Sequence, residues 1–110
     1  MAKELKFVML LDCYGDLLTE HQRSVMEMYY CEDLSLAEIG SPMGITRQAV
    51  LSLIKRTEGL LLNYEEKLGF ARRLAKMRVF EELEKLTAMV PDEKIRTGLA
   101  EQINTATELL

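Results

Sequence analysis

LSLAEIGSPMGITRQAVLSLIKR, residues 34–56, is the stretch of sequence that decides the fold. Ser35 and Glu38 have the spacing of a capping box, in which a hydroxyl and a carboxylate bond reciprocally to the backbone at a helix start. Pro42 lacks a backbone N–H and disfavours helix at the residue before it, so this helix should be short. Gly44 then supplies a residue that tolerates the left-handed conformation. The pattern therefore predicts a short helix followed by a turn.

A second, longer helix is predicted after the turn. Thr46 is a suitable N-cap, and apolar residues follow it at helical spacing as far as Leu68. Gly40 is small enough to let the two helices cross closely, and such a pair has the form of a helix-turn-helix. The residues expected to lock the pair together are Ile39, Met43, Ile45, Val50 and Leu53. The remaining inward positions of the longer helix would be Ile54, Thr57, Leu61, Tyr64 and Leu68.

The opposite face of the longer helix is polar and carries the candidate site. At about 100° per residue, Gln48, Ser52 and Lys55 lie opposite the apolar positions. Arg and Gln side chains can make bidentate hydrogen bonds to base edges, and Lys neutralises phosphate. In a helix-turn-helix, the N-terminal residues of the second helix can enter the major groove of DNA. The candidate nucleic-acid-binding residues are therefore Thr46, Arg47, Gln48, Leu51, Ser52, Lys55 and Arg56, with Arg72, Arg73, Lys76 and Arg78 as further phosphate contacts.

The distribution of charge is compatible with such a surface. The net charge of the 110-residue chain is −4, yet residues 45–78 hold eight basic and three acidic side chains, and both flanking segments are acidic. A basic segment between two acidic ones is expected where one surface meets phosphate and the others keep the protein in solution. A solvated helix of mixed charge would give the same distribution. Charge alone therefore leaves both interpretations open.

Two helices are expected before the motif. The first spans about residues 2–14 and ends near Gly15, and its apolar residues are frequent enough to form a broad inward face. The second begins after Thr19, where Gln22 completes another capping box. Residues 31–33 would connect this helix to the motif. The inward residues would be Leu5, Phe7, Val8, Leu10 and Leu11 in the first helix and Gln22, Val25, Met26 and Tyr29 in the second.

Gly69 marks a boundary, after which two more helices are expected. The first spans residues 70–89, and Pro91 suits the first turn of the second. Their inward apolar positions would be Leu74, Met77, Phe80, Leu83 and Leu86, followed by Ile95, Leu99, Ile103 and Ala106. We therefore predict an all-α protein with a helix-turn-helix domain at residues 1–69 and a C-terminal helical extension at residues 70–110. The extension either packs on the domain or forms a homodimer interface.

Other kinds of chemistry find little support in the sequence. Cys13 and Cys31 occur without a CxxC motif or a histidine cluster, so we expect two reduced thiols in or near the core and no metal site. His21 has no recognisable catalytic partner in the sequence and suits a surface or capping role. Neither a Walker loop nor a GxGxxG motif occurs, so no nucleotide cofactor is expected. The apolar runs are too short to cross a bilayer and no signal peptide is recognisable, so we expect a non-enzymatic protein of the cytoplasm.

Two blocks of the sequence resemble known families. LTEHQRSVMEMYY (residues 18–30) followed by LSLAEIGSPMGITRQAV (residues 34–50) is similar to the fourth conserved region of bacterial sigma factors, a helix-turn-helix that reads promoter DNA. The closer resemblance is to the YlxM family of small sigma-region-4-like proteins. That family's pattern reappears as LLT at residues 17–19, YY at 29–30, SLAEI at 35–39, RQAV at 47–50, IKRTE at 54–58 and NYEEKLG at 63–69. Residues 70–110 match it only in being helical.

The resemblance to the YlxM family implies a sigma-region-4-like helix-turn-helix bundle and a regulatory protein linked to the signal recognition particle pathway. The partners it implies are the RNA of that particle, its GTPase, or DNA. Pro42 and Leu51 depart from the family pattern, the first by ending the first motif helix early and the second by placing an apolar residue on the outer face. The alternative is a protein-interaction module that acts on the GTPase or the transcription machinery through Leu51 and the apolar stripe of residues 70–89.

Overall fold

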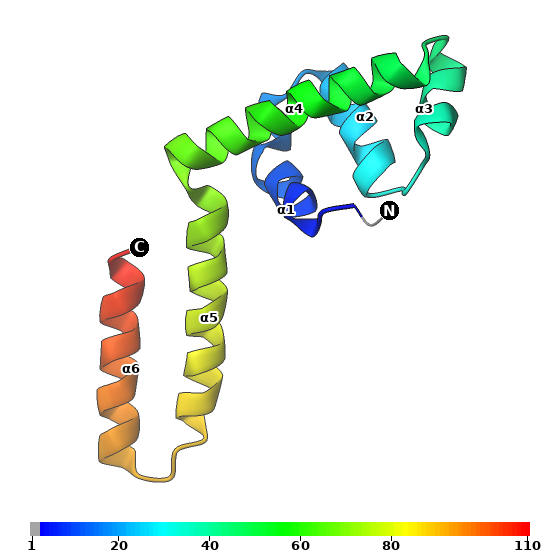
Figure 1. The fold of residues 1–110 in the computed structure, drawn as a ribbon. Coiled ribbons are helices and arrows are strands. Elements are labelled where there is room, and N and C mark those ends of the chain that lie inside the picture. The colour runs from blue at the N-terminus through cyan, green and yellow to red at the C-terminus, as the bar shows by residue number, and fades with distance from the viewer. Residues whose placement is uncertain (1–2) are drawn as a thin grey trace. The chain divides into compact units, whose positions relative to one another are not determined.

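The computed structural model describes residues 3–110, and every regular element in that range is a helix (Figure 1). In chain order, the elements are α1 (Leu5–Tyr14), the short 3-10 helix η1 (Gly15–Leu17), α2 (Glu20–Tyr30), α3 (Leu36–Met43), α4 (Arg47–Leu68), α5 (Phe70–Ala88) and α6 (Glu93–Glu108). The predicted all-α fold class is confirmed. None of the described helices combines the length and hydrophobicity needed to cross a bilayer. The chain forms two compact units, an N-terminal unit, Met1–Gly69, and a C-terminal unit, Phe70–Leu110.

In the N-terminal unit, α4 is the central element. Helices α1, α2 and α3 each pack against it (Figure 1). Val50, Ile54 and Leu61 on α4 are buried, as the helical periodicity predicts. Thr57 is buried in the same stripe, and its hydroxyl donates a hydrogen bond to the Leu53 carbonyl at 2.8 Å. This stripe determines which side of α4 faces the core of the unit and which side faces solvent.

The predicted N-caps are confirmed at three helix starts. The Gln22 N–H donates to the Thr19 hydroxyl at 3.2 Å, and the Thr19 N–H donates to the Gln22 side chain at 3.0 Å. Ser35 and Glu38 form the second capping box, with both hydrogen bonds at 3.1 Å. The Thr46 hydroxyl caps α4 by accepting a backbone N–H at 3.0 Å. These local hydrogen bonds satisfy donors that a helix start otherwise leaves unpaired.

The inward face of α1 differs from the predicted one. The buried residues of this helix are Phe7, Leu10, Leu11 and Tyr14. Leu5, which was expected to point inward, is 78% exposed, and Val8 is half-buried. Six of the seven residues from Leu5 to Leu11 are apolar, so their spacing does not single out one face of the helix. Tyr14 lies about two helical turns after Phe7, on the same face, and its complete burial accompanies this orientation of α1.

Helix α3 continues further than its proline suggested. Pro42 was expected to disfavour helix at Ser41 and to keep the helix short; both residues are helical, and α3 ends one residue later at Met43. A proline in the last turn removes only one intrahelical hydrogen bond. The Gly44 N–H approaches the carbonyls of Gly40 and Ser41, so the end of the helix is closed by backbone hydrogen bonds despite the proline. Pro42 therefore does not itself end α3, which continues through it to Met43.

The C-terminal unit is a hairpin of the antiparallel helices α5 and α6 (Figure 1). The Asp92 carboxylate caps α6 by accepting a hydrogen bond from the Ile95 N–H at 3.0 Å. Pro91 therefore precedes α6, and the prediction that it occupies the first turn is wrong. The difference arises because Asp is a strong N-cap, and Pro91 lies in the bend directly before it.

Most apolar residues expected to point inward in this hairpin are exposed. They are Leu74, Met77, Leu83, Leu86, Ile95 and Leu99. Within the described hairpin, the buried residues are Thr87 and Ile103, which lie where α5 and α6 face each other. Each helix has a single helical neighbour in the unit, so it can cover only part of the other's apolar surface. The sequence pattern identified the apolar faces of the two helices, but the unit itself leaves most of these apolar residues exposed.

Candidate nucleic-acid interface

The crossing of α3 and α4 depends on Gly40, which is buried. A Cβ atom at this position would lie 2.6 Å from the carbonyl oxygen of Ile45 and 3.1 Å from Cγ2 of Val50. The first distance is shorter than real Cβ contacts allow, and the atom it meets belongs to the backbone, which cannot move aside as a flexible side chain could. The predicted role of Gly40 as the small residue at the crossing is confirmed.

Gly44 makes the turn between the two helices. Its φ of 70° and ψ of 26° place it in the left-handed region, as predicted. The Gly44 N–H donates to the Ser41 carbonyl at 3.2 Å, and the Ile45 N–H donates to the Gly40 carbonyl at 3.1 Å. The side chain of Ile45, expected to lock the helices, is 37% exposed. Because Ile45 lies in the turn itself, its backbone, and not its side chain, makes the close contact with Gly40.

The first three turns of α4 and its cap present one edge to solvent, which we call the recognition face. It comprises Thr46, Arg47, Gln48, Leu51, Ser52, Lys55 and Arg56. Six of these residues are exposed, and Leu51 is half-buried. Val50 and Ile54 anchor the opposite side of α4 in the core. The first turn of α4 carries Arg47 and no acidic residue, so the positive end of the helix dipole is not neutralised there.

A buried carboxylate lies under the recognition face. Glu58 on α4 is buried, and it accepts a hydrogen bond from the Tyr30 hydroxyl of α2 at 2.7 Å. Its second oxygen lies 3.4 Å from Nζ of Lys55. Lys55 keeps 71% of its side chain exposed, and an ion pair of this kind contributes at most about 1 kcal/mol. Glu58 can therefore orient Lys55 without preventing its ammonium group from reaching a phosphate.

The contact between Tyr30 and Glu58 was not predicted from the sequence. The pKa of Tyr30 is raised well above its ordinary value, mainly by burial and in second place by the hydrogen bond to Glu58. The spacing of Lys55 and Glu58, three residues apart on one helix, was a usable signal for the ion pair. The Tyr30 partner comes from a different helix and could not be identified without knowing how α2 packs on α4. The pair joins α2 to α4 below the recognition face.

The connection between α2 and α3 is held by Lys3. Its ammonium group donates hydrogen bonds to the carbonyls of Tyr29 at 2.6 Å and Leu34 at 3.0 Å, and it pairs with Asp33 at 3.1 Å. The same group lies 3.8 Å from the centre of the Tyr29 ring. Asp33 has a positive φ of 56°, which Asp tolerates better than most residues. Lys3 thus fastens the chain where it enters the motif.

The basic residues predicted after Gly69 belong to a different unit from the recognition face. Arg72, Arg73, Lys76 and Arg78 lie in the first half of α5 and are exposed. The guanidinium carbon of Arg73 is 5.9 Å from the centre of the Phe70 ring. The structure thus places the seven residues of the recognition face together on one helix and its cap, and it places the four predicted basic residues of α5 on the C-terminal hairpin.

The remaining groups considered for chemistry are dispersed. In residues 3–110 there is no cluster of three or more His, Cys, Asp or Glu side chains suited to a metal ion. Cys13 is half-buried and Cys31 is exposed, so the prediction of two thiols in or near the core is wrong for Cys31, which follows directly after α2. The pKa of Cys31 is nevertheless raised, mainly by desolvation of the thiol and in second place by neighbouring acidic side chains, so the thiolate is disfavoured. His21 is exposed in the first turn of α2.

The helix-turn-helix geometry agrees with comparison to known proteins. The family described as UPF0122, "Putative helix-turn-helix protein, YlxM / p13 like", matches residues 1–103. The chain belongs to the UPF0122 family. The resemblance to the YlxM family that the sequence motifs suggested is therefore confirmed, and the match extends through most of the C-terminal hairpin, where the motifs gave no signal.

Relatives within UPF0122 cover this chain to different extents. A UPF0122 protein of Symbiobacterium thermophilum is 46% identical over 96 residues, which are 86% of this chain and 90% of the relative. One of Bacillus licheniformis is 38% identical over 105 residues, which are 94% of this chain and 98% of the relative. One of Clostridium kluyveri is 52% identical over 69 residues, which are 63% of this chain and 62% of the relative's length. The chain is thus similar to UPF0122 proteins of several bacteria.

Proposed function

We propose that this UPF0122 member is a non-enzymatic regulator that binds nucleic acid through the recognition face of α4. The observation that carries the proposal is the close crossing at Gly40, which turns the polar edge beginning at Arg47 outward while Val50 stays in the core. Arg47 and Gln48 lie in the first turn of α4, the part of a second motif helix that contacts base edges. Each good bidentate contact of this kind discriminates by about 1 to 3 kcal/mol.

The remaining polar residues suit the phosphate backbone. Lys55 and Arg56 lie further along α4 and are exposed, and Ser52 can donate a hydrogen bond from its hydroxyl. Phosphate contacts fix the orientation of a protein on the duplex and make binding depend on salt. Further phosphate contacts would come from Arg72, Arg73, Lys76 and Arg78 on α5. In this proposal they raise affinity without selecting a sequence.

Duplex DNA is the target that suits the recognition face best. The major groove of B-form DNA admits an α-helix, whereas that of A-form RNA is too deep and narrow for side chains to read. RNA would have to present an unpaired loop or bulge to Arg47 and Gln48. The RNA of the signal recognition particle is the structured RNA to test, because the resemblance to the YlxM family implies that pathway.

A second candidate function is contact with a protein, such as the GTPase of the signal recognition particle or the transcription machinery, without nucleic-acid readout. Leu51 favours it, because this apolar, half-buried side chain lies within the recognition face. Protein contact through Leu51 would respond weakly to salt, whereas phosphate contact responds strongly. The two functions are therefore separable by one titration series.

Titration of labelled duplex DNA and of structured RNA at several salt concentrations tests the proposal. The Lys55→Ala/Arg56→Ala variant should bind all sequences more weakly, and its salt slope should fall by roughly 0.9 for each lost phosphate contact with DNA. The control Lys6→Ala/Lys94→Ala removes the same charge outside the recognition face and should bind as the wild type does. A wild-type protein without affinity for either nucleic acid at low salt would refute the proposal. Association with a protein that is abolished by Leu51→Asp but not by Lys55→Ala would establish the second function instead.

A further inference from the structure

The C-terminal hairpin has too small a core to account for its apolar surface. Thr87 and Ile103 are the residues buried in its described 41-residue span, Phe70–Leu110. Units of about 40 residues rarely bury enough surface to be stable without a disulfide, a metal or association. Leu86 is 61% exposed, and Ile95 and Leu99 are also largely exposed. The hairpin therefore carries an apolar surface that calls for a partner.

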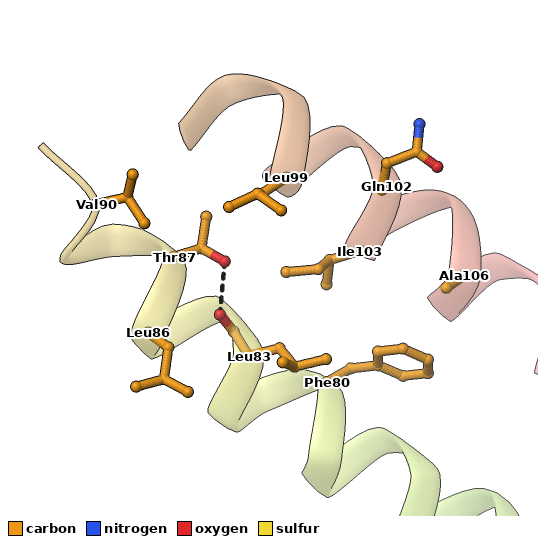
Figure 2. Close-up of a pocket in the computed structure, with 9 residues that line it drawn as sticks. All are labelled: Phe80, Leu83, Leu86, Thr87, Val90, Leu99, Gln102, Ile103 and Ala106. Carbon is orange, nitrogen blue, oxygen red and sulfur yellow. Dashed lines mark hydrogen bonds between the residues drawn. The ribbon is translucent and has the colours of Figure 1, made fainter. Parts of the chain in front are cut away.

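This apolar surface is shaped as a groove between the two helices (Figure 2). The groove has a volume of about 390 Å³, and its lining includes Phe80, Leu83 and Leu86 from α5 and Leu99, Ile103 and Ala106 from α6. Figure 2 shows the side chains of Leu83 and Ile103 directed towards each other across it. The Thr87 hydroxyl in the same wall donates to the Leu83 carbonyl at 2.7 Å, so this buried polar group is satisfied within its own helix. The surface is suited to an apolar helix.

The charge on α5 indicates which helix this is. Residues 70–80 carry four basic and no acidic side chains, whereas residues 81–88 carry three acidic side chains and one lysine. The helix is thus positive in its first half and negative in its second. Two copies of α5 placed antiparallel would set each basic half beside the acidic half of the other copy. A parallel arrangement would set like charges together, which is unfavourable.

We propose that the C-terminal hairpin is a self-association surface, on which two copies of this chain pair about a two-fold axis with their α5 helices antiparallel. Such a pair is isologous, so a single self-complementary surface satisfies both copies. The four helices would cover Leu83, Leu86 and Leu99, as in a four-helix bundle. Opposite charges such as Lys76 and Glu81 would flank the apolar contact and select the antiparallel orientation. The proposal is independent of whether the recognition face binds DNA, RNA or protein.

The mass of the full chain in solution, measured by sedimentation equilibrium, tests the apolar contact. The wild type should show twice the 12.6 kDa mass of one chain, and Leu86→Asp should shift the equilibrium to the monomer. Leu5→Asp is the matched control, because Leu5 is even more exposed and lies on α1 of the other unit. It should leave the dimer intact. A monomeric wild type at every soluble concentration, or a dimer unaffected by Leu86→Asp, would overturn the proposal.

A pair of charge variants tests the electrostatic contact separately, because these variants leave the residues of the apolar groove unchanged. Glu81→Lys/Glu82→Lys makes both halves of α5 basic, whereas Lys76→Glu/Arg78→Glu neutralises the first half and leaves the second half acidic. Each variant alone should dimerise roughly tenfold more weakly, which corresponds to about 1.4 kcal/mol. An equimolar mixture of the two should recover the dimer mass. Equal dimerisation of each variant alone and in the mixture would overturn the proposal.

Discussion

Replacing Gly40 with alanine probes the crossing on which the recognition face depends. In an open helix, a Gly→Ala change stabilises by about 0.5 to 1 kcal/mol, because alanine has the higher helix propensity. At Gly40 the added methyl carbon would lie 2.6 Å from the Ile45 carbonyl oxygen, so α3 and α4 must move apart. Overpacking of this kind costs about 1 to 3 kcal/mol. A backbone obstacle corresponds to the upper end of that range, and the gain in helix propensity offsets part of this cost. We therefore expect Gly40→Ala to lower the free energy of unfolding by about 2 kcal/mol.

Urea unfolding, monitored by tyrosine fluorescence, measures this change in the free energy of unfolding of the N-terminal unit. All four tyrosines lie within residues 1–69, and Trp is absent, so the signal reports the N-terminal unit. Gly59→Ala is the matched control, because Gly59 lies inside α4 and nothing lies within 4 Å of its added Cβ. This control should raise the midpoint of unfolding. If Gly40→Ala unfolds at the same urea concentration as Gly59→Ala or higher, the close crossing is refuted.

Three further predictions concern the contacts around the motif. Because the pKa of Tyr30 is raised in the folded state, its contribution to the free energy of unfolding is complete below pH 10 and declines as the pH rises further. Tyr30→Phe should therefore lower the free energy of unfolding by about 1 to 2 kcal/mol at pH 7, and the loss of stability above pH 10 should be less steep in this variant. The hydrogen bond to the Ser35 backbone lowers the pKa of Glu38, so the contribution of Glu38 to the free energy of unfolding is present above pH 4.5 and is lost as the pH falls. Glu38→Gln should therefore make the loss of stability in acid less steep. Gly44→Ala should destabilise by about 1 to 2 kcal/mol through its left-handed backbone, whereas Gly44→Asn should cost less, as urea unfolding would show. An unchanged pH profile in either of the first two variants, or equal stability of the two Gly44 variants, would contradict the corresponding contact.

The parts of the fold that sequence reasoning predicted well depend on neighbours a few residues apart. The capping boxes at Thr19 and Ser35 and the left-handed turn at Gly44 involve partners within four residues. Their side-chain chemistry therefore determines the local backbone almost independently of the rest of the chain. The helix bounds of α4 follow from the same signals, because Thr46 caps its start and Gly69 takes a left-handed conformation at its end.

The features that were missed depend on packing between distant elements. The inward face of α1 is selected by Tyr14, whose hydroxyl donates to Glu65 on α4 at 2.6 Å. The link between Tyr30 and Glu58 spans 28 residues, and only the packing of α2 on α4 brings the two together. The exposed groove of the C-terminal hairpin was predicted as inward because periodicity identifies an apolar face but does not identify what covers it.

For the candidate site, the sequence identified the residues and the structure adds their common orientation. The recognition face was predicted from the angular positions of Gln48, Ser52 and Lys55, and these residues are exposed together on α4. Their role in binding remains a prediction. Glu58 was not among the predicted site residues. Its burial beneath Lys55 is visible only in three dimensions.

Mapping backbone amide chemical shifts by NMR, during titration of the full chain with duplex DNA, tests the recognition face most directly. We predict that the largest shifts occur at Thr46, Arg47, Gln48 and Ser52, and that amides of α1 and α2 remain close to their starting positions. The Gln48→Ala variant should reduce these shifts, because it removes a base-edge contact without altering the core. The absence of shifts along α4, with changes confined to the groove between α5 and α6, would contradict the account.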